Sequence, residues 1–215
     1  MHKLYFDILP KNQLNIFNNL SQQDWIKDFY LAGGTALALQ IGHRRSIDFD
    51  FFTPNDFNLE MIKERLGEIG LFIPHYSQKN TLVGEINKVQ LSFFKYKYKI
   101  TTSFITFKKI KISSKLDIAL MKLDAISGRG SKKDFIDLFF LLNEFKLIEL
   151  ITRLPDKFGE KNNIAYQVLR SLVYFEDAED QLMPEMIKKV NWKKIKNKME
   201  VEVKKIDLRT LYNKK

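Results

Sequence analysis

The stretch Tyr30-Leu31-Ala32-Gly33-Gly34-Thr35 decides the fold of this chain, because it passes from an apolar strand into a helix through two glycines. The apolar residues 29–32 predict a short strand. The Ala/Leu-rich residues 35–41 predict a helix that ends at Gly42, a residue suited to a left-handed helix end. Two glycines at such a junction let the backbone approach a ligand closely and point amide N–H groups outward at the positive helix end. Gly33 and Gly34 therefore indicate a phosphate-binding turn.

Two aspartates follow this turn closely, in the segment Ser46-Ile47-Asp48-Phe49-Asp50-Phe51-Phe52. The alternation of polar and apolar residues over 46–52 predicts a strand on which Asp48 and Asp50 share one face. Two carboxylates held side by side are the hard oxygen ligands that Mg²⁺ requires when a nucleoside triphosphate supplies the others. The alternative is an ordinary turn before a strand with a solvated aspartate face, although aspartate is disfavoured in strands.

The rest of the N-terminal half predicts an α/β unit with a small mixed or antiparallel sheet. Apolar residues at helical spacing and at the strand period indicate two more helices and two more strands. The expected helices cover residues 11–19 and 59–70, and the expected strands cover residues 81–86 and 89–97. Only Asn87-Lys88 separates these two strands, so they are expected to form a hairpin.

From residue 113 onward the pattern is largely helical. Ser113-Ser114 is a suitable helix start, Gly128-Arg129-Gly130 breaks one apolar stripe from the next, and a later helix is expected over residues 164–174. The α/β fold class therefore divides into two parts. We expect an α/β domain over residues 1–112 and a helical domain with a basic C-terminal tail over residues 113–215.

Composition excludes several other chemistries. The 215 residues include no Cys and three His, which removes thiol catalysis, Cys-ligated zinc, iron–sulfur clusters and a histidine-rich metal site. No apolar run approaches the roughly 20 residues of a membrane span, and the N-terminus lacks the apolar stretch of a signal peptide. The sequence therefore predicts a soluble, cytoplasmic protein with no membrane partner.

The formal net charge of +10 is concentrated in two segments. Residues 188–215 hold eleven Lys/Arg and three acids, and residues 95–111 hold six Lys and no acid, which leaves about four net negative charges elsewhere. These segments predict a polyanionic partner, first of all nucleic acid, unless the lysines only solvate the surface. Residues 93–99 alternate aromatic and cationic side chains, which is typical of a base-stacking surface and equally of an edge strand protected by lysines.

Four blocks of the sequence carry a family resemblance. They are Leu31-Ala-Gly-Gly-Thr-Ala-Leu-Ala-Leu39, His43-Arg-Arg-Ser-Ile-Asp-Phe-Asp-Phe-Phe52, Asp117-Ile-Ala-Leu-Met-Lys-Leu-Asp-Ala-Ile126 and Arg129-Gly-Ser-Lys-Lys-Asp-Phe-Ile-Asp-Leu138. With these blocks the chain resembles the nucleotidyltransferase-like toxins of the AbiEii/AbiGii type, in the minimal nucleotidyltransferase superfamily. The resemblance covers most of the chain. It implies a nucleotidyltransferase fold, binding of Mg²⁺ and a nucleoside triphosphate, transfer of nucleotides to the 3′ end of tRNA in some members, and a cognate antitoxin.

The resemblance also implies roles for particular residues. Asp48 and Asp50 would be catalytic and hold the metal, and Lys122 and Asp134 would be the functional lysine and aspartate of the later blocks. The nucleotide contacts would come from Gly33, Gly34, Thr35, Arg44, Arg45, Ser46 and Lys122. Arg44 and Arg45 would bridge phosphates, or else form ordinary ion pairs with the aspartates.

For Lys122 and Asp134 the residues themselves also allow a purely structural interpretation. Lys122 borders an apolar stripe, where a lysine either extends to water or reaches into a cleft. Asp134 lies three residues after Ser131, and Ser-x-x-Asp is close to a capping box, so this aspartate can also stabilise the start of its helix.

One position departs from the pattern of polymerising relatives, which place a third carboxylate on a later strand. Ser92 occupies that position here, and serine is a poor metal ligand and a poor general base; Glu85 on the preceding strand could substitute. The leading hypothesis is a Mg²⁺-dependent nucleotidyltransferase toxin acting on RNA such as tRNA, within a toxin–antitoxin or phage-defence system. The alternative is a catalytically silent nucleotide- or nucleic-acid-binding module on the same fold. A third hypothesis is that the basic tail binds an acidic antitoxin.

Overall fold

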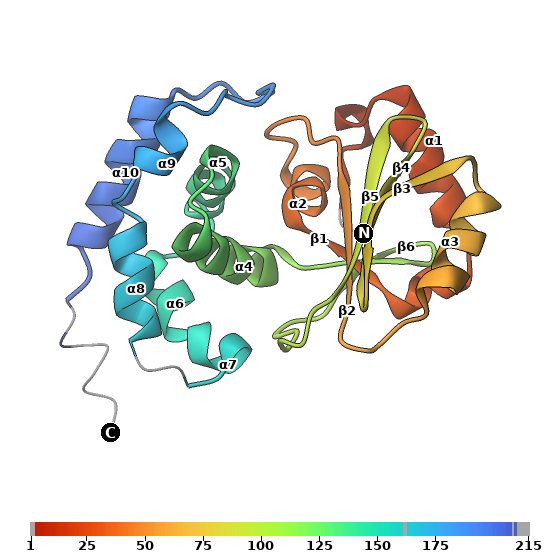
Figure 1. The fold of residues 1–215 in the computed structure, drawn as a ribbon. Coiled ribbons are helices and arrows are strands. Elements are labelled where there is room, and N and C mark those ends of the chain that lie inside the picture. Colours follow the sequence, from red (N-terminus) through yellow and green to blue (C-terminus); the bar gives the residue numbers. More distant parts are fainter. Residues whose placement is uncertain (1–2, 161–162, 208, 210–215) are drawn as a thin grey trace. The chain divides into compact units, whose positions relative to one another are not determined.

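The computed structural model describes residues 3–160, 163–207 and 209, and the chain forms two compact units (Figure 1). The first unit comprises the residues up to 98 together with 103–114, and the second comprises 99–102 together with the residues from 115 onward. The backbone therefore crosses from one unit to the other three times. Within the described residues, no helix combines the length and the apolar character that crossing a bilayer requires.

The first unit contains a seven-stranded mixed sheet in the order β3-β4-β5-β2-β1-β7-β6. The β1–β7 and β2–β5 pairs are parallel, and the other neighbours are antiparallel. The strands are β1 (Tyr30–Ala32), β2 (Phe49–Thr53), β3 (Phe72–Gln78), β4 (Thr81–Ile86), β5 (Val89–Lys95), β6 (Ile105–Phe107) and β7 (Ile110–Ile112). The strands expected near residues 29–32, 46–52, 81–86 and 89–97 are thus confirmed, with shifted ends, whereas β3, β6 and β7 were not predicted.

Helices cover both faces of this sheet. They are α1 (Lys11–Leu20), α2 (Gly33–Ile41) and α3 (Leu59–Gly67), with short 3-10 helices at Phe6–Ile8 and Trp25–Asp28. Figure 1 shows α2 on one face of the sheet and α1 and α3 on the other. The chain ends α2 at Gly42, whose φ of 59° is left-handed as expected. The Asn58 side chain accepts hydrogen bonds from two backbone amides at the start of α3.

Alternation along β2 separates the core from the functional face. Phe49 and Phe51 are fully buried, and their rings stack on Phe17 of α1 at 5.6 Å and on Phe93 of β5 at 5.2 Å. Asp50 lies between these two phenylalanines, so it projects from the opposite face of the sheet, on which α2 lies. Burial of the phenylalanines therefore fixes the side on which the aspartate appears.

The predicted hairpin forms between β4 and β5. Asn87 and Lys88 have φ values of 50° and 63°, as a two-residue loop of type I′ requires. Because β5 lies between β4 and β2 it is an interior strand, and it ends at Lys95, so the edge strand considered for residues 93–99 is not formed. Lys95 ends β5 and forms an ion pair with Asp56 at 2.6 Å.

The second unit is helical, as expected. Its helices are α4 (Lys115–Gly128), α5 (Lys132–Leu141), α6 (Leu147–Thr152), α7 (Leu154–Phe158), α8 (Ile164–Ser171), α9 (Glu176–Glu179) and α10 (Trp192–Lys204). The predicted break between the first two helices is confirmed, with a left-handed φ of 52° at Gly130. The apolar stripes of α4 and α5 pack against each other and form the centre of this unit.

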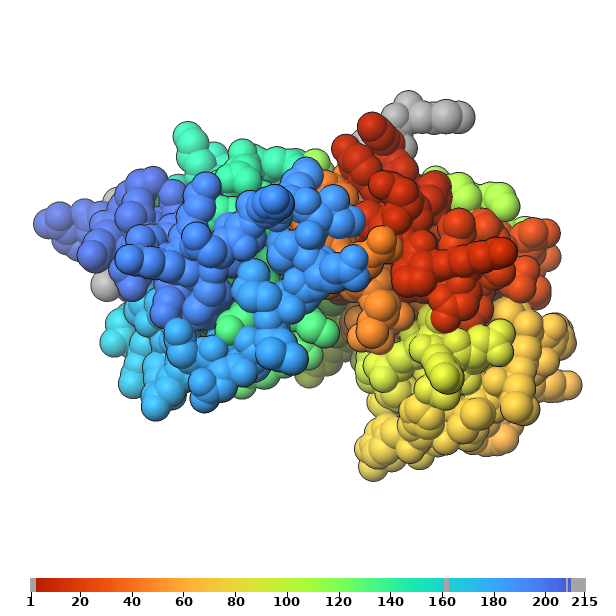
Figure 2. All heavy atoms as spheres, turned by 90° about the horizontal axis from the view of Figure 1, so that it is seen from above, coloured from red at the N-terminus to blue at the C-terminus, as the bar shows by residue number. Residues whose placement is uncertain are grey.

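The basic C-terminal segment contains the packed helix α10, so over residues 192–204 the predicted basic tail is a helix of the second unit. Ile195 and Met199 of α10 are fully buried, and the Trp192 ring contacts Phe135 at 5.8 Å and Phe175 at 5.9 Å. The space-filling view in Figure 2 shows α10, in blue, at the surface of the second unit. Residues 208 and 210–215 of the predicted tail lie outside the described residues.

Candidate functional site

The two motifs of the N-terminal half meet at the start of α2. Gly33 has a φ of 71°, and a Cβ atom placed on it would lie 2.8 Å from Oδ2 of Asp50. The backbone register agrees, because Ala32 on β1 pairs with Asp50 on β2. The carboxylate of Asp50 therefore lies directly against the glycine turn, at a position where any side chain on residue 33 would be strained and would collide.

The neighbouring glycine provides room for the segment before β2. A Cβ atom on Gly34 would overlap Nη2 of Arg44 and would lie 3.2 Å from Oγ of Ser46. The Thr35 hydroxyl lies 2.9 Å from the same Ser46 oxygen and donates a hydrogen bond to the carbonyl oxygen of Asp48. These contacts fasten residues 44–48 to the first turn of α2.

The strand that carries the aspartates begins later than predicted. β2 starts at Phe49, so Asp50 lies on the strand and Asp48 immediately precedes it; placing both on the strand was wrong. Asp48 and Asp50 are nevertheless both half-buried and flank the buried Phe49, which continues the alternation by one residue. Asp48 lies outside the strand, and the hydrogen bond from the Thr35 hydroxyl to its carbonyl oxygen holds it in place.

The oxygen donors of this region fit a magnesium ion whose remaining ligands come from a substrate. Two carboxylates, Asp48 and Asp50, lie within three residues of each other beside a glycine turn. Among the residues that the structure describes, no group of three or more His, Cys, Asp or Glu side chains could hold a metal by itself. The donor set therefore matches a metal shared with a phosphate ligand and does not match a closed structural metal site.

The two arginines of the second motif differ in position. Arg44 is 3% exposed and lies against Gly34, with Nη1 donating to the carbonyl oxygen of Arg45 at 3.0 Å. Arg45 is half-buried, and its Nη1 donates to the carbonyl oxygen of Ile8 at 3.3 Å. Arg44 is therefore part of the glycine and aspartate cluster, while Arg45 also binds the N-terminal segment.

The position of the missing third carboxylate is occupied by Ser92. Ser92 on β5 pairs with Asp50 on the neighbouring parallel strand and is 2% exposed. Glu85 lies on the same face of β4, but its strand neighbour is Gln90 and its carboxylate lies 3.8 Å from Nε2 of His75. A neutral hydroxyl thus stands directly beside Asp50, and the nearest acidic substitute faces a histidine.

Lys122 neither extends to water nor lies exposed on a helix face. Its side chain is 7% exposed, and Nζ lies 2.7 Å from Oδ1 of Asp134 and 2.7 Å from Oδ2 of Asp137. Burial opposes the charge on the amine, but Asp137 and Asp134 outweigh burial and hold the pKa of Lys122 above its ordinary value. Lys122 is therefore a charged lysine inside the second unit, shared by two carboxylates.

Asp134 is the centre of this cluster. Arg129 donates to it from Nε at 2.9 Å and from Nη2 at 3.3 Å, and the Ser131 hydroxyl donates at 2.6 Å. Burial raises the pKa of Asp134, but Lys122, Arg129 and Ser131 together lower it below the ordinary aspartate value. Ser131 makes no side-chain bond to the backbone at the start of α5, so the predicted capping box is not formed.

Sequence reasoning missed two members of the buried charge pairs. Asp137 is fully buried one turn after Asp134. The sequence signal for its burial was that this second acid lies between two apolar residues, Ile136 and Leu138. Lys157 is 2% exposed and binds Asp117 at 2.9 Å, and no local pattern links residues 40 positions apart.

Asp117 belongs to a different, structural cluster. Its carboxylate accepts backbone and hydroxyl hydrogen bonds from Thr101 and Thr102, and Lys157 also donates to the carbonyl oxygen of Lys99 at 2.8 Å. These contacts bind the four-residue segment 99–102 into the helical unit. The predicted residues Asp48 and Asp50 belong to the first unit, and Lys122 and Asp134 belong to the second.

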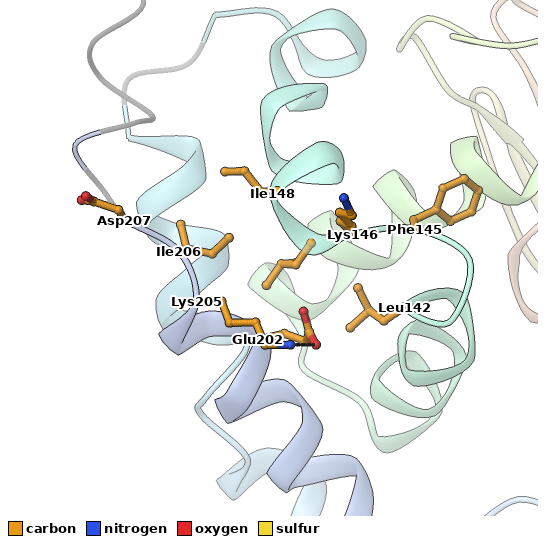
Figure 3. Close-up of a pocket in the computed structure, with 9 residues that line it drawn as sticks. Leu142, Phe145, Lys146, Ile148, Glu202, Lys205, Ile206 and Asp207 are labelled. Carbon is orange, nitrogen blue, oxygen red and sulfur yellow. Dashed lines mark hydrogen bonds and ion pairs between the residues drawn. The ribbon is translucent and has the colours of Figure 1, made fainter.

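A hollow of about 460 Å³ opens in the second unit, between the end of α5, the start of α6 and the end of α10 (Figure 3). Its lining is mainly apolar, with an ion pair between Lys205 and Glu202 at 2.7 Å on one side. None of the predicted catalytic, nucleotide-binding or metal-binding residues lines this hollow, although its α10 side belongs to the basic segment 188–215.

Comparison with known proteins identifies the class of this fold. The structure is similar to that of JHP933 from Helicobacter pylori, with a TM-score of 0.56, 17% identity and 94% of each chain covered. It is also similar to MenT4, a nucleotidyltransferase toxin from Mycobacterium tuberculosis, with a TM-score of 0.52 and 14% identity over 93% of this chain and 87% of that one. At these identities the likeness defines the fold, which is that of the nucleotidyltransferases.

Sequence comparison then gives the family. The family model described as "Nucleotidyl transferase AbiEii toxin, Type IV TA system" matches residues 15–120, which include both glycines and both aspartates of the site. A protein of Aquifex aeolicus described as uncharacterized, aq_aa25, is 38% identical over 181 residues, which is 81% of this chain and 86% of that protein. The chain belongs to the AbiEii family of nucleotidyltransferase toxins, as the four sequence blocks predicted.

Proposed function

We propose that this protein transfers a nucleotide from a nucleoside triphosphate to a hydroxyl group of an RNA acceptor such as tRNA. The observation that carries the proposal is the contact between the Gly33 turn and the Asp50 carboxylate, which brings a phosphate-binding backbone and an acidic group to one point. The acceptor hydroxyl attacks the α-phosphorus, the bond from that phosphorus to the bridging oxygen breaks, and pyrophosphate leaves.

The triphosphate is held by the start of α2 and the segment packed on it. Gly33 and Gly34 allow the phosphates to approach the backbone, and Arg44 lies against Gly34 with a guanidinium that suits phosphate oxygens. Thr35, Ser46 and Arg45 complete the proposed contact set. Because the Thr35 hydroxyl already bonds to the Asp48 carbonyl, its main contribution in this proposal is to position the aspartate.

Asp48 and Asp50 are the proposed ligands of Mg²⁺. When bound, the ion would neutralise phosphate charge and favour ionisation of the acceptor hydroxyl. The protein's own part is to hold the two carboxylates beside the glycine turn and to orient the triphosphate. Ser92 contributes no charge beside Asp50, so the chain supplies one acidic group fewer than a polymerising relative with three carboxylates. We therefore expect slow transfer of a small number of nucleotides.

Lys122 and Asp134 lie in the second unit and enter the proposal as the functional lysine and aspartate that the family resemblance implies. The amine of Lys122 is already shared by Asp134 and Asp137, so direct phosphate binding by this lysine would require it to leave two buried carboxylates. The RNA acceptor is expected along exposed lysines such as Lys193 and Lys194 of α10. The substrates place the reaction in the cytoplasm, with a cognate antitoxin as the protein partner of the system.

Incubation of the protein with each labelled nucleoside triphosphate, Mg²⁺ and total RNA tests the proposal. We expect label on an RNA species with the wild type and a loss of at least about a hundredfold in Asp48→Ala and in Asp50→Ala. Val83→Ala, a change on β4, which β5 separates from the strand of Asp50, is the control and should retain transfer. Equal labelling by wild type and both aspartate variants would refute the enzymatic proposal.

A second candidate function rests on Ser92 alone. A chain that lost its third carboxylate could bind nucleotide or nucleic acid on the same fold without catalysis. This candidate requires RNA affinity that falls steeply with salt and does not change in Asp48→Ala. Charge reversal at Lys193 and Lys194, measured against RNA and against an acidic antitoxin separately, distinguishes an RNA surface from a protein-binding surface.

A further inference from the structure

We propose that Phe52 of β2 and Phe94 of β5 form an aromatic platform on which a nucleobase of the substrates stacks. The proposal rests on the proposed function only for the identity of the compound that carries the base. It adds a place for the base to a site in which the glycine turn and the aspartates account only for phosphates and metal. Both phenylalanines belong to the first unit, as do Gly33 and Asp50.

The strand register places the platform beside the aspartate. Two rows of paired residues cross β1, β2 and β5: an aspartate row of Ala32, Asp50 and Ser92, and an aromatic row of Tyr30, Phe52 and Phe94. The rows are two residues apart on every strand, so both project from the face of the sheet that carries Asp50. A rise of about 3.3 Å per residue separates them by roughly 7 Å. A nucleotide with its phosphates at the aspartate row can therefore place its base over the aromatic row.

The two rings contact each other and are supported by other aromatic side chains. The centroids of Phe52 and Phe94 lie 5.6 Å apart, with an interplanar angle of 34°. Tyr30 stacks on Phe52 at 5.9 Å, and the Tyr96 ring meets Phe52 edge-on at 5.4 Å. Tyr30 is 3% exposed, so it supports Phe52 from inside the fold. These contacts hold the platform in a defined position.

Phe52 and Phe94 differ in exposure from the phenylalanines that precede them in the chain. Phe51 and Phe93 are fully buried in the core on the opposite face of the sheet, whereas Phe52 and Phe94 are half-buried. Part of each platform ring thus remains in contact with water, which is unfavourable for an apolar surface. A flat ligand that covers the rings removes this area from water. Every nucleobase offers such a flat π-face, and stacking on aromatic side chains tolerates any base.

The charge around the platform fits a nucleotide or an RNA better than an apolar protein segment. Lys111 of β7 pairs with Tyr30 and so continues the aromatic row. Lys95 and Lys97 follow Phe94 in the chain, and both are exposed. Proteins that bind single-stranded nucleic acid combine cations, which attract the phosphates, with rings that stack on the bases.

Binding measurements on the full-length chain test the platform with probes that do or do not carry a base. The first pair is a nonhydrolysable nucleoside triphosphate and tripolyphosphate, each with Mg²⁺. The second pair is a single-stranded RNA oligonucleotide and an abasic oligonucleotide of the same length. The first pair reports on the base of the nucleotide and the second on the bases of the acceptor, so the two sources are distinguished.

Phe52→Leu and Phe94→Leu each keep an apolar side chain and remove the ring. We expect each variant to raise the Kd of at least one base-bearing probe about fivefold or more, as for the loss of one stacked base. The Kd of the matching probe without a base should change less than about twofold. Phe52→Tyr keeps the ring and should bind every probe within about twofold of the wild type.

Phe57→Leu is the matched control. Phe57 is also a half-buried phenylalanine of the first unit, but its ring packs on Phe29 at 5.4 Å, and Phe29 contacts Phe93 of the core. This variant should change no Kd by more than about twofold. Equal losses in Phe57→Leu and Phe52→Leu would indicate a general effect on the fold and overturn the proposal. Unchanged binding of both base-bearing probes in Phe52→Leu and Phe94→Leu, or equal losses with and without the base, would overturn it as well.

Failure of the platform and failure of the proposed function give different results. Tripolyphosphate with Mg²⁺ reports on the glycine turn and the aspartates alone, so Asp50→Ala should weaken its binding and Phe52→Leu should not. Nucleotide transfer with unchanged base-bearing probes in Phe52→Leu and Phe94→Leu would refute the platform alone. Selective loss of a base-bearing probe in a protein without transfer would refute the enzymatic proposal alone. Absence of binding of every probe by the wild type would refute both.

Discussion

Gly33 shows how one residue can join the two halves of a site. Its φ is left-handed, and a Cβ atom added to it would lie 2.8 Å from Oδ2 of Asp50, so this position leaves no place for a side chain. We predict that Gly33→Ala is destabilising by about 1–2 kcal/mol from the backbone alone, and that it displaces Asp50 and abolishes nucleotide binding. Urea unfolding and nucleotide titration measure the two effects.

Gly67→Ala is the control for this substitution. Gly67 ends α3 without a left-handed φ, and a Cβ atom there would meet no atom within 4 Å. Alanine at this position should leave both stability and nucleotide binding close to those of the wild type. A Gly33→Ala protein that bound nucleotide as well as the Gly67→Ala protein would contradict the proposed turn.

Lys122 is expected to be more important for stability than an ordinary lysine. Lys122→Met would remove the cation that the buried Asp134 and Asp137 share, and removing one partner of a buried pair costs about 3–5 kcal/mol. Lys115→Met, which loses only a partly exposed pair with Glu144, should cost about 0–1 kcal/mol. Denaturant unfolding of both variants measures the difference. Similar costs would show that the Lys122 cluster is solvated.

At the scale of the element, α10 shows why a charge count misleads. Its lysines made the segment resemble a tail, but Ile195 and Met199 occur at helical spacing and bury a face in the second unit. Deleting this segment would therefore remove part of a core. Charge reversal at exposed lysines tests RNA binding without that loss.

The core role of α10 gives a direct prediction. Met199→Ala should lower the free energy of unfolding by about 2–5 kcal/mol, because it empties a fully buried site. Val201→Ala on the same helix, where the valine is 50% exposed, should change it by about 0.5 kcal/mol or less. Urea denaturation curves decide the matter, and equal midpoints for the two variants would mean that α10 does not contribute to the core.

The strands that sequence reasoning missed lack the usual strand pattern, for two different reasons. β6 and β7 have three residues each, which is too short for an alternating pattern to appear. β3 is an edge strand with Pro74 inside it and a register shift between Pro74 and Tyr76, and most of its side chains are exposed. Proline and exposure remove the alternation of apolar and polar residues by which a strand is recognised, so only its pairing with β4 identifies β3 as a strand.

At the scale of the whole molecule, the buried carboxylates of the second unit predict acid sensitivity. The pKa values of Asp117 and Asp134 are lowered in the folded protein, because their cationic and hydrogen-bonding partners outweigh burial. A lowered folded-state pKa gives stability that is full above the ordinary aspartate pKa of about 3.9 and is lost as pH falls through the folded-state value. Unfolding free energy should therefore decrease steeply below about pH 4.

Asp117→Asn checks the origin of this decrease. The variant lacks the Asp117 carboxylate, so its stability should be lower near neutral pH and should fall less steeply in acid. Urea unfolding of both proteins at several pH values measures the two slopes. Equal slopes for the variant and the wild type would place the acid sensitivity in other groups.

Local sequence predicted much of the first unit and of its site. Three local patterns carried the prediction: glycines at a strand-to-helix junction, aspartates alternating with phenylalanines, and a two-residue hairpin loop. Each depends on residues adjacent in the chain, so it can be recognised without a structure. The family resemblance, in contrast, placed Ser92 at the position of the absent carboxylate, and the β2–β5 register sets it beside Asp50. The fold and the family followed from these short patterns.

The sequence by itself determined the glycine turn, the two aspartates, the helical second half and the family of this protein. Tertiary structure alone decided which charges are buried together: Lys122 with Asp134 and Asp137, and Asp117 with Lys157. The physical reason is that burial and electrostatic pairing depend on residues far apart in the chain, whereas backbone conformation depends mainly on adjacent ones. The sequence predicted Lys122 as a surface or cleft lysine, and the tertiary structure shows it buried and shared by two aspartates.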